Sequence, residues 1–335
     1  MKLTYRAANY ELGLDVTGKF NVVIGHSGSG KSRLAEIANE FSGISNTHAR
    51  IPRPIYSSHG GDITPYISEA HGAVLVFDEY FHSNWLRLRM SEMQSSDNYY
   101  IFITRDGISE VPYGLNNTFR VSHSSGNRLY MRPCYPNLLH RDKDSCKVFI
   151  AEDSTLGYHH LKDILPGSLV VSAEGKSKLV DLIKSYRGKA KCLIVFDSCG
   201  IGADAAGLVE LQRAGDCTLF DSASFEQEVL SCDFPKLYRE FTESDIPAYH
   251  SEEDFYISQL SDVLNKLWGI GYHKNDTQLS KLLETGIANI HGTVCRMKDA
   301  GGVTGQTYRE LRDDQPKQDL EPAKKLKSIS KMSLG

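Results

Sequence analysis

The sequence lacks the features of a membrane-spanning, exported or disulfide-built protein. No apolar run approaches the roughly 20 residues that a spanning helix needs, and the N-terminus has no apolar core with a small-residue cleavage site, so we expect no membrane segment and no signal peptide. The seven cysteines form no C-x-x-C pair and follow no regular spacing, which favours reduced thiols in a cytoplasmic protein. The net charge of -4 excludes a globally basic nucleic-acid binder but not a local basic patch.

What the sequence does contain is enough apolar material for an ordinary core. Of 335 residues, 40% are hydrophobic and 24% are charged, as in soluble globular proteins, and this length allows two domains. In the first part of the chain, alternating or continuous apolar runs predict strands. The expected strands are residues 10–16, 20–24, 72–80 and 98–106, followed by a hairpin at 118–135, with a helix at 32–41 and a polar loop at 49–65.

A second alternation of strands and helices begins near residue 146. Strands are expected at 146–153, 168–173, 191–197 and 217–221, with helices at 155–165, 178–186 and 205–213. This order predicts an open α/β sheet whose functional residues lie at the carboxyl ends of the strands. We therefore expect an α/β protein with a first domain at 1–135, a smaller second domain at 146–232, a helical region at 233–312 and a disordered tail at 313–335.

The stretch GHSGSGKS, residues 25–32, matches the phosphate-binding pattern G-x-x-x-x-G-K-[ST] between an expected strand and an expected helix. The backbone N–H groups of such a loop and the helix N-terminus form an anion site. We expect Lys31 to reach the β- and γ-phosphates and act in catalysis, and Ser32 to ligate Mg²⁺. The setting favours this interpretation over a glycine-rich turn without a ligand. The predicted nucleotide-binding residues of the loop are Gly25, Ser27, Gly28, Ser29, Gly30, Lys31 and Ser32.

Two acids end the expected buried strand AVLVFDEY. Asp78 is predicted to hold Mg²⁺ through water, as a Walker B aspartate does. Glu79 is predicted to be the catalytic residue that orients or deprotonates the attacking water. Acids at strand ends are often simple surface caps, but the phosphate-binding loop favours the functional interpretation here.

The next expected strand ends in FITRD, which places polar groups at the same edge of the sheet. If this strand lies beside the acidic one, Thr104 or Arg105 comes near the γ-phosphate, and Arg105 becomes a nucleotide-binding residue. The alternative is that Arg105 only pairs with Asp106 or Glu110.

The N-terminal strands, the loop and the Asp–Glu pair together resemble the ATP-binding-cassette branch of P-loop ATPases, over roughly residues 1–133. The resemblance implies ATP and Mg²⁺ as cofactors. The chain has no LSGGQ-like signature, and the distance from Ser32 to Asp78 is too short for the usual helical subdomain, so we expect a minimal ATPase. No NKxD-type guanine-reading motif occurs, which favours ATP over GTP.

Acids also follow the expected strands of the second domain. Glu152 and Asp153 end one strand, Asp197 ends another, and Glu226 comes later. Carboxylates that converge at strand ends can hold Mg²⁺ for phosphodiester cleavage. The alternative is that these acids have no catalytic role and only cap the strands of a sheet that serves as a docking surface.

The order of these acids, with VVSAEGKSKL between the first two, resembles the TOPRIM fold of topoisomerases, primases and the overcoming-lysogenization-defect nucleases, over residues 146–232. In those nucleases a cassette-type ATPase precedes a TOPRIM domain, as here. The resemblance implies that Glu152 is an acid/base or metal residue and that Asp197 is a metal ligand. Cys199 stands where the family pattern has a second Asp, so the site is expected to be degenerate.

Three functions remain open from the sequence. The first is an ATPase in which nucleotide gates a metal-dependent nuclease, of the kind found in phage defence or mobile elements. The second is an ATP-dependent switch or scaffold whose second domain binds a protein partner without catalysis, and the third is a small-molecule kinase. The expected partners are nucleic acid and either another protein or a second copy of the chain. In a dimer Arg87 and Arg89 act as arginine fingers; otherwise they lie on a solvated helix face.

Overall fold

The computed structural model describes the chain as two compact units. The described residues are 1–7, 9–42, 52–79, 83–124, 127–136, 146–154, 158–159, 161–162, 169–220, 223–234, 249–269 and 271–273. Unit 1 contains Met1–Leu138, Ser198–Ala206 and Thr242–Phe255, and unit 2 contains Leu139–Asp197, Gly207–Phe241 and Tyr256–Gly335. The expected tail at 313–335 and most of the expected helices at 155–165 and 233–312 lie outside the described residues.

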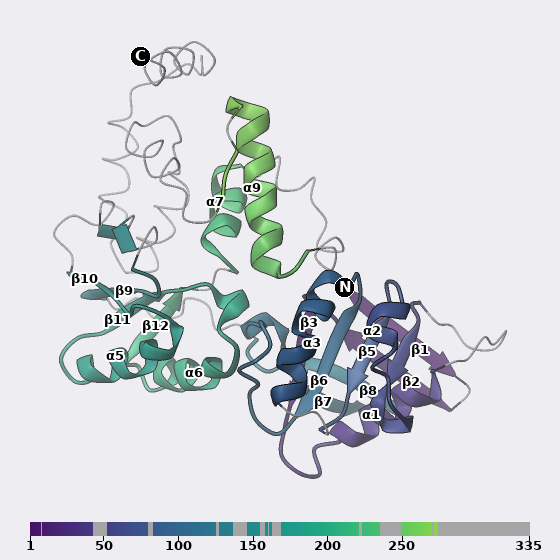
Figure 1. Ribbon diagram of the computed structural model, residues 1–335. Helices are drawn as coiled ribbons and strands as arrows, with labels where there is room; N and C mark the ends of the chain where they lie inside the picture. Colours follow the sequence, from purple (N-terminus) through teal and green to yellow (C-terminus); the bar gives the residue numbers. More distant parts are fainter. Residues whose placement is uncertain are drawn as a thin grey trace. The chain divides into compact units, whose positions relative to one another are not determined.

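Unit 1 is built on one curled, mixed sheet of eight strands (Figure 1). The strand order is β1-β2-β8-β7-β3-β6-β5-β4. From β7 to β4 all neighbouring strands are parallel, whereas β1 with β2 and β7 with β8 are antiparallel. The strands are β1 Lys2–Ala7, β2 Tyr10–Asp15, β3 Phe20–Ile24, β4 Ile55–Ser57, β5 Val74–Phe77, β6 Tyr99–Thr104, β7 Thr118–Ser124 and β8 Arg128–Pro133.

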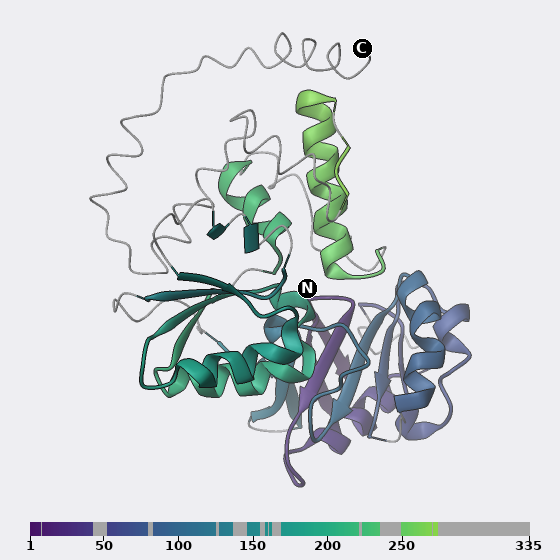
Figure 2. The ribbon, with the colours of Figure 1, turned by 60° about the vertical axis from the view of Figure 1, so that its left-hand side comes forward.

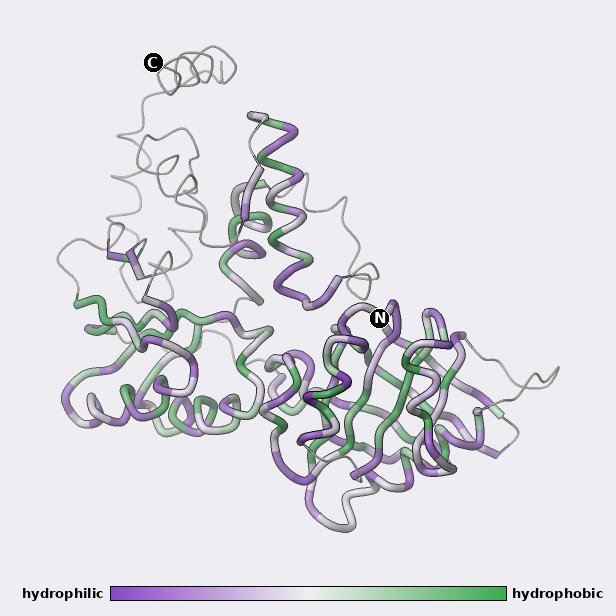
Figure 3. The backbone as a smooth tube through the Cα atoms, viewed as in Figure 1, coloured by the Kyte–Doolittle hydropathy of each residue, from purple (hydrophilic) through white to green (hydrophobic). Residues whose placement is uncertain are grey.

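The parallel strands of unit 1 are buried on both faces, which explains their continuous apolar sequences. On β6, Ile101 and Ile103 pack into the core cluster that includes helix α1, while Tyr100 and Phe102 pack into the cluster that includes α2 and α3. Figure 3 shows hydrophobic colour concentrated along these strands. The helices are α1 Lys31–Glu40, α2 Tyr66–Glu69 and α3 Ser83–Ser95.

The structure confirms the expected strands and hairpin of the first domain, but the expectation of an unbroken loop at 49–65 is wrong. Ile55–Ser57 forms β4, which pairs in parallel with β5. This strand has only three residues and follows Pro52 and Pro54, so its sequence resembles a loop. It is the last strand of the sheet, where nearby prolines are tolerated because one edge needs no ladder bonds.

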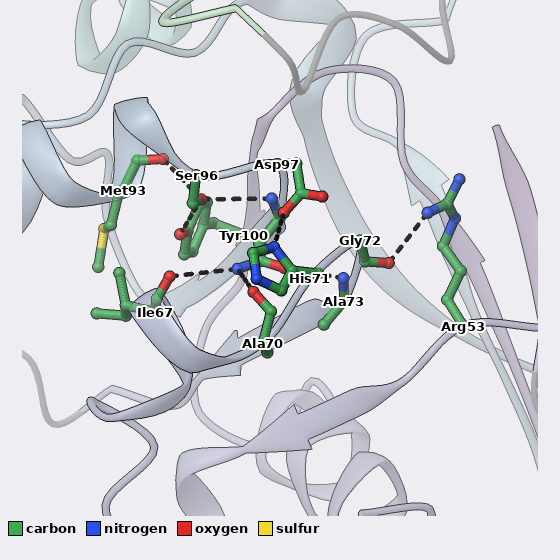
Figure 4. A network of polar contacts seen from close by, with 11 residues as sticks. Arg53, Ile67, Ala70, His71, Gly72, Ala73, Met93, Ser96, Asp97 and Tyr100 are labelled. Atoms are coloured by element: carbon green, nitrogen blue, oxygen red, sulfur yellow. Dashed lines mark hydrogen bonds and ion pairs between the residues drawn. The ribbon is translucent and has the colours of Figure 1, made fainter.

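A buried asparagine connects the start of β6 to the segment between α2 and β5. Asn98, just before β6, is fully buried, and its side-chain oxygen accepts the Ala73 N–H at 2.9 Å. Its amide nitrogen donates to the carbonyl oxygens of Ala70 at 2.8 Å and Ile67 at 3.3 Å. Figure 4 shows this network of polar contacts, with these three partners labelled. One side chain therefore satisfies three backbone groups between α2 and the start of β5.

We expect Asn98→Ala to lower the free energy of unfolding of the protein by about 2–4 kcal/mol, because three buried backbone groups lose their partner. Urea unfolding followed by circular dichroism measures the change. His71→Ala is the control, since His71 is 82% exposed and its 3.3 Å contact with Asp97 lies at the surface; we expect a change in the free energy of unfolding below about 0.5 kcal/mol there. Equal losses in the two variants would contradict this role of Asn98.

Unit 2 is built on four parallel strands in the order β10-β9-β11-β12. β10 lies on one side of β9, and the later strands β11 and β12 lie on its other side. The strand order therefore reverses between β9 and β11. Helices α5 and α6 lie along one face of this sheet (Figure 1 and Figure 2). The elements that lie wholly in unit 2 are β9 Val148–Ala151, β10 Leu169–Ser172, β11 Cys192–Val195, β12 Cys217–Phe220, α5 Leu179–Tyr186 and α7 Phe225–Asp233. Helices α6 Ala205–Arg213 and α9 Glu252–Trp268 have their first residues in unit 1 and most of their length in unit 2.

Cys192 and Cys217, on strands β11 and β12 of unit 2, are free thiols. Burial is the main cause that raises the pKa of Cys192 to about 11 and the pKa of Cys217 to about 12. Such thiols stay protonated at neutral pH, and a protonated thiol is a poor nucleophile and a poor metal ligand. In the described part of the chain, no helix is both long and apolar enough to cross a membrane.

Candidate functional site

The glycine-rich loop at residues 25–30 connects β3 to α1 and presents the amino end of this helix. Gly28 and Gly30 have φ values of 81° and 88°, in the left-handed region that glycine adopts without strain. Gly30 is the N-cap residue of α1, which has no side-chain cap and no acid in its first turn. No side chain of the helix itself therefore caps its first N–H groups, and uncapped helix N-termini attract anions.

Lys31 folds back over this loop. The side chain is only 5% exposed, and its Nζ donates to the carbonyl oxygens of Gly25 at 2.5 Å and His26 at 3.1 Å. The same ammonium lies 3.1 Å from Glu79 Oε1. The positive charge is thus held at the mouth of the loop and paired with one acid.

Close packing and one unmatched hydroxyl mark the inner side of the loop. A Cβ atom on Gly25 would lie 2.6 Å from Ser29 Oγ, so a larger residue here would displace the serine hydroxyl. The Ser29 Oγ is buried and has no hydrogen-bond partner among the described residues. Ser27, Gly28 and Ser32 are exposed at the loop tip and the helix start. The loop thus combines exposed donors with one buried donor that could bind an anion.

The two predicted acids follow β5, two strands away from β3, which the loop follows. Asp78 directly follows β5 and is 5% exposed, and Glu79 is 28% exposed. The sheet places β6 between β3 and β5. Because neighbouring strands are about 4.8 Å apart, the backbones of β3 and β5 are separated by roughly 10 Å.

Arg105, which directly follows β6, completes a charged cluster with Lys31 and Glu79. The condition on which its role depends is met, since β5 and β6 pair in parallel. Its Nε lies 3.3 Å from Glu79 Oε2, whereas the alternative partner Glu110 lies 3.5 Å from Arg87. Both oxygens of Glu79 are therefore engaged, one by Lys31 and one by Arg105.

The same contacts explain the acidity of Glu79. The hydrogen bond from Lys31 is the main cause that holds the pKa of the Glu79 carboxyl below its usual range, and the charges of Lys31 and Arg105 add to it. Glu79 consequently remains ionised at neutral pH. A second anion that attracts Lys31 and Arg105 would remove both stabilising partners and make Glu79 a stronger base.

Asp78 is fixed by residues that the sequence analysis assigned to a loop. The Asp78 N–H donates to Ser58 Oγ at 2.9 Å, and Asp78 Oδ1 accepts the Glu79 N–H at 3.0 Å. The second oxygen, Oδ2, lies 3.5 Å from His59 Nδ1. Ser58 and His59 follow β4 directly, so recognition of that edge strand beside β5 was the missing signal.

In unit 2, the structure brings Glu152 and Asp197 together. They follow β9 and β11, the neighbouring strands between which the strand order reverses. Glu152 Oε2 accepts the Asp197 N–H at 3.0 Å, and Asp197 Oδ1 accepts the Phe225 N–H at 3.2 Å. In open α/β sheets this reversal point is where ligands bind.

Glu226 has a different environment from these two acids. It is 4% exposed, and its Oε1 accepts the Tyr272 hydroxyl at 2.8 Å, a contact that ties the segment after α9 to α7. Within the described residues no group of three or more His, Cys, Asp or Glu side chains could hold a metal ion. A metal ion at either acidic pair would therefore need further ligands from phosphate or water.

Comparison of the chain with models of known families, with curated proteins and with solved structures found no match.

Proposed function

We propose that unit 1 binds ATP with Mg²⁺ and hydrolyses it, as a minimal P-loop ATPase that resembles the cassette branch. The observation that carries the proposal is the convergence of Lys31, Glu79 and Arg105, from three neighbouring positions of the sheet, at the mouth of the glycine-rich loop. A site with two cations, one base and an uncapped helix N-terminus suits the β- and γ-phosphates of a nucleotide.

Each residue has a distinct role in this proposal. The N–H groups at the start of α1 and the buried Ser29 hydroxyl bind phosphate oxygens. Ser32 and Asp78 would hold Mg²⁺, which neutralises phosphate charge when it is bound. Bound phosphate competes with Glu79 for Lys31 and Arg105, so the Glu79 carboxylate becomes available to accept a proton from water.

The first test is an assay of the purified protein with ATP. We expect release of inorganic phosphate that needs Mg²⁺, stops on addition of EDTA and is slower with GTP. Release without metal, or no binding of any nucleotide, would contradict the proposal. Transfer of phosphate to an added metabolite in place of release would support the small-molecule kinase.

For unit 2 we propose cleavage of a nucleic-acid phosphodiester bond, controlled by ATP and consistent with a resemblance to overcoming-lysogenization-defect nucleases. The placement of Glu152 and Asp197 at the strand reversal favours this function. The hydrogen bonds from backbone N–H groups orient both carboxylates. Each carboxylate can accept several hydrogen bonds, so oxygen lone pairs remain for a metal ion. Mg²⁺ bound between them and a substrate phosphate would supply the charge neutralisation.

The test is incubation of DNA and RNA with the protein, Mg²⁺ or Mn²⁺, and ATP. We expect Glu152→Gln and Asp197→Asn to lower the cleavage rate by at least about a hundredfold. Glu174→Gln is the matched control, because Glu174 is 68% exposed and pairs only at the surface with Lys178, 2.8 Å away. Full activity in the first two variants would contradict the assignment.

If the wild-type protein leaves both nucleic acids intact, the alternative is an ATP-dependent switch that binds a protein partner or a second copy. A change in molecular mass with MgATP, seen in the wild type and absent in Lys31→Ala, would support it. Equal mass in all samples would leave only the ATPase proposal for unit 1.

A further inference from the structure

One histidine lies against the glycine-rich loop on the side opposite to the acids. β7 is the neighbour of β3 on the side away from β6 and β5. Val23 is opposite Phe119, so the end of β7 reaches the level of the loop that follows β3. A Cβ atom on Gly30 would lie 2.9 Å from His123 Cε1 and closer still to its Nε2. The imidazole ring therefore rests on the Gly30 backbone.

The orientation of this ring follows from the alternation along β7. Phe119, Val121 and His123 point to one face of the sheet, because successive side chains alternate. Phe119 lies in the core cluster of α1, and Val121 packs against it. His123 is the next residue on that face and is exposed. It presents a planar, polar ring beside the amino end of α1.

The charged cluster sets the direction of a bound nucleotide. The terminal phosphate belongs near Lys31, Arg105 and Glu79, on the β6 and β5 side of the loop. The other end of the phosphate chain, with its nucleoside, then extends toward β7.

Building on the proposed ATP site, we propose that His123 contacts the nucleoside of the bound nucleotide and stacks on its base. The neighbouring ring on this face, Tyr10, is covered by the Arg33 guanidinium, whose carbon lies 5.2 Å from the ring centroid. Arg33 is itself held by Glu36 at 2.7 Å. His123 has its ring on the loop backbone and exposed to solvent, so it is the better platform for a planar base.

The test compares ATP with inorganic tripolyphosphate, which has the phosphates but no nucleoside. Removal of an aromatic platform weakens base binding by about five- to a hundredfold. We expect His123→Ala to weaken ATP and ADP binding by about tenfold and to change tripolyphosphate binding by less than about twofold. His123→Phe keeps a stacking ring and is expected to bind ATP within about threefold of the wild type. His71→Ala serves as the surface control.

The outcomes separate this inference from the proposed function. If the wild type binds tripolyphosphate as tightly as ATP, or if His123→Ala weakens both ligands equally, the nucleoside contact is wrong while the phosphate site stands. ATP binding that is as weak in His123→Phe as in His123→Ala would also overturn stacking. If the wild type binds neither ligand, both the ATP site and the nucleoside contact fail.

Discussion

Lys31→Ala is expected to weaken MgATP binding by at least about a hundredfold, because charge-assisted hydrogen bonds to phosphate are lost. The lysine is 5% exposed and is held over the loop by the Gly25 and His26 carbonyl oxygens, so its ammonium is already placed where phosphates bind. Little side-chain entropy is lost when a phosphate joins this arrangement. Isothermal titration calorimetry with ATP and Mg²⁺ measures the affinity.

The Lys31→Ala variant should remain folded, so a loss of ATP binding can be assigned to the missing ammonium. Glu79 keeps Arg105 as a partner at 3.3 Å, so no carboxylate is left without a cation. Arg128→Ala is the control: Arg128 is 55% exposed on β8 and lies 3.9 Å from Glu11, and we expect unchanged ATP binding. A lysine variant that binds ATP like the wild type, with an unchanged circular dichroism spectrum, would contradict a phosphate site in this loop.

The elements of the fold were predictable where the sequence carries a local pattern. The buried strands β3, β5 and β6 are continuous apolar runs, and α1 follows the glycine-rich loop directly. Their order in the sheet was not predictable, because pairing is set by packing between distant segments. The adjacency of β5 and β6 could be stated only as a condition until the structure showed it.

In the candidate site too, local sequence patterns identified residues but not the contacts between segments that are distant in the sequence. The glycine pattern identified Gly30, but it could not show that the ring of His123, from a distant strand, lies against the backbone of this residue. Likewise, the sequence named Lys31 and Glu79 separately and could not show that they lie 3.1 Å apart. His59 was missed because its strand, β4, is too short and too close to prolines to give a periodic signal.

Glu79→Gln is expected to keep ATP binding within about threefold of the wild type and to lower the hydrolysis rate by at least about a hundredfold. The glutamine has nearly the same shape and can still accept a hydrogen bond from Lys31, but it cannot accept a proton from water. Removal of the negative charge also frees Lys31 and Arg105 for the phosphates, so a modest gain in affinity would agree with this role. Calorimetry and a phosphate-release assay measure the two quantities separately.

Glu36→Gln provides the matched control on the same side of unit 1. Glu36 is 39% exposed on α1 and pairs with Arg33 at 2.7 Å, and its other carboxylate oxygen lies 4.0 Å from His59 Nε2. Loss of the Glu36 charge should change the rate of ATP hydrolysis by less than about twofold, because ion pairs at the surface contribute little to stability. If Glu79→Gln hydrolyses ATP at the wild-type rate, Glu79 is only a partner that holds Lys31 and Arg105, and the base must be another group. If both binding and hydrolysis fall together, Glu79 positions the phosphate-binding cations and its role in proton transfer is not supported.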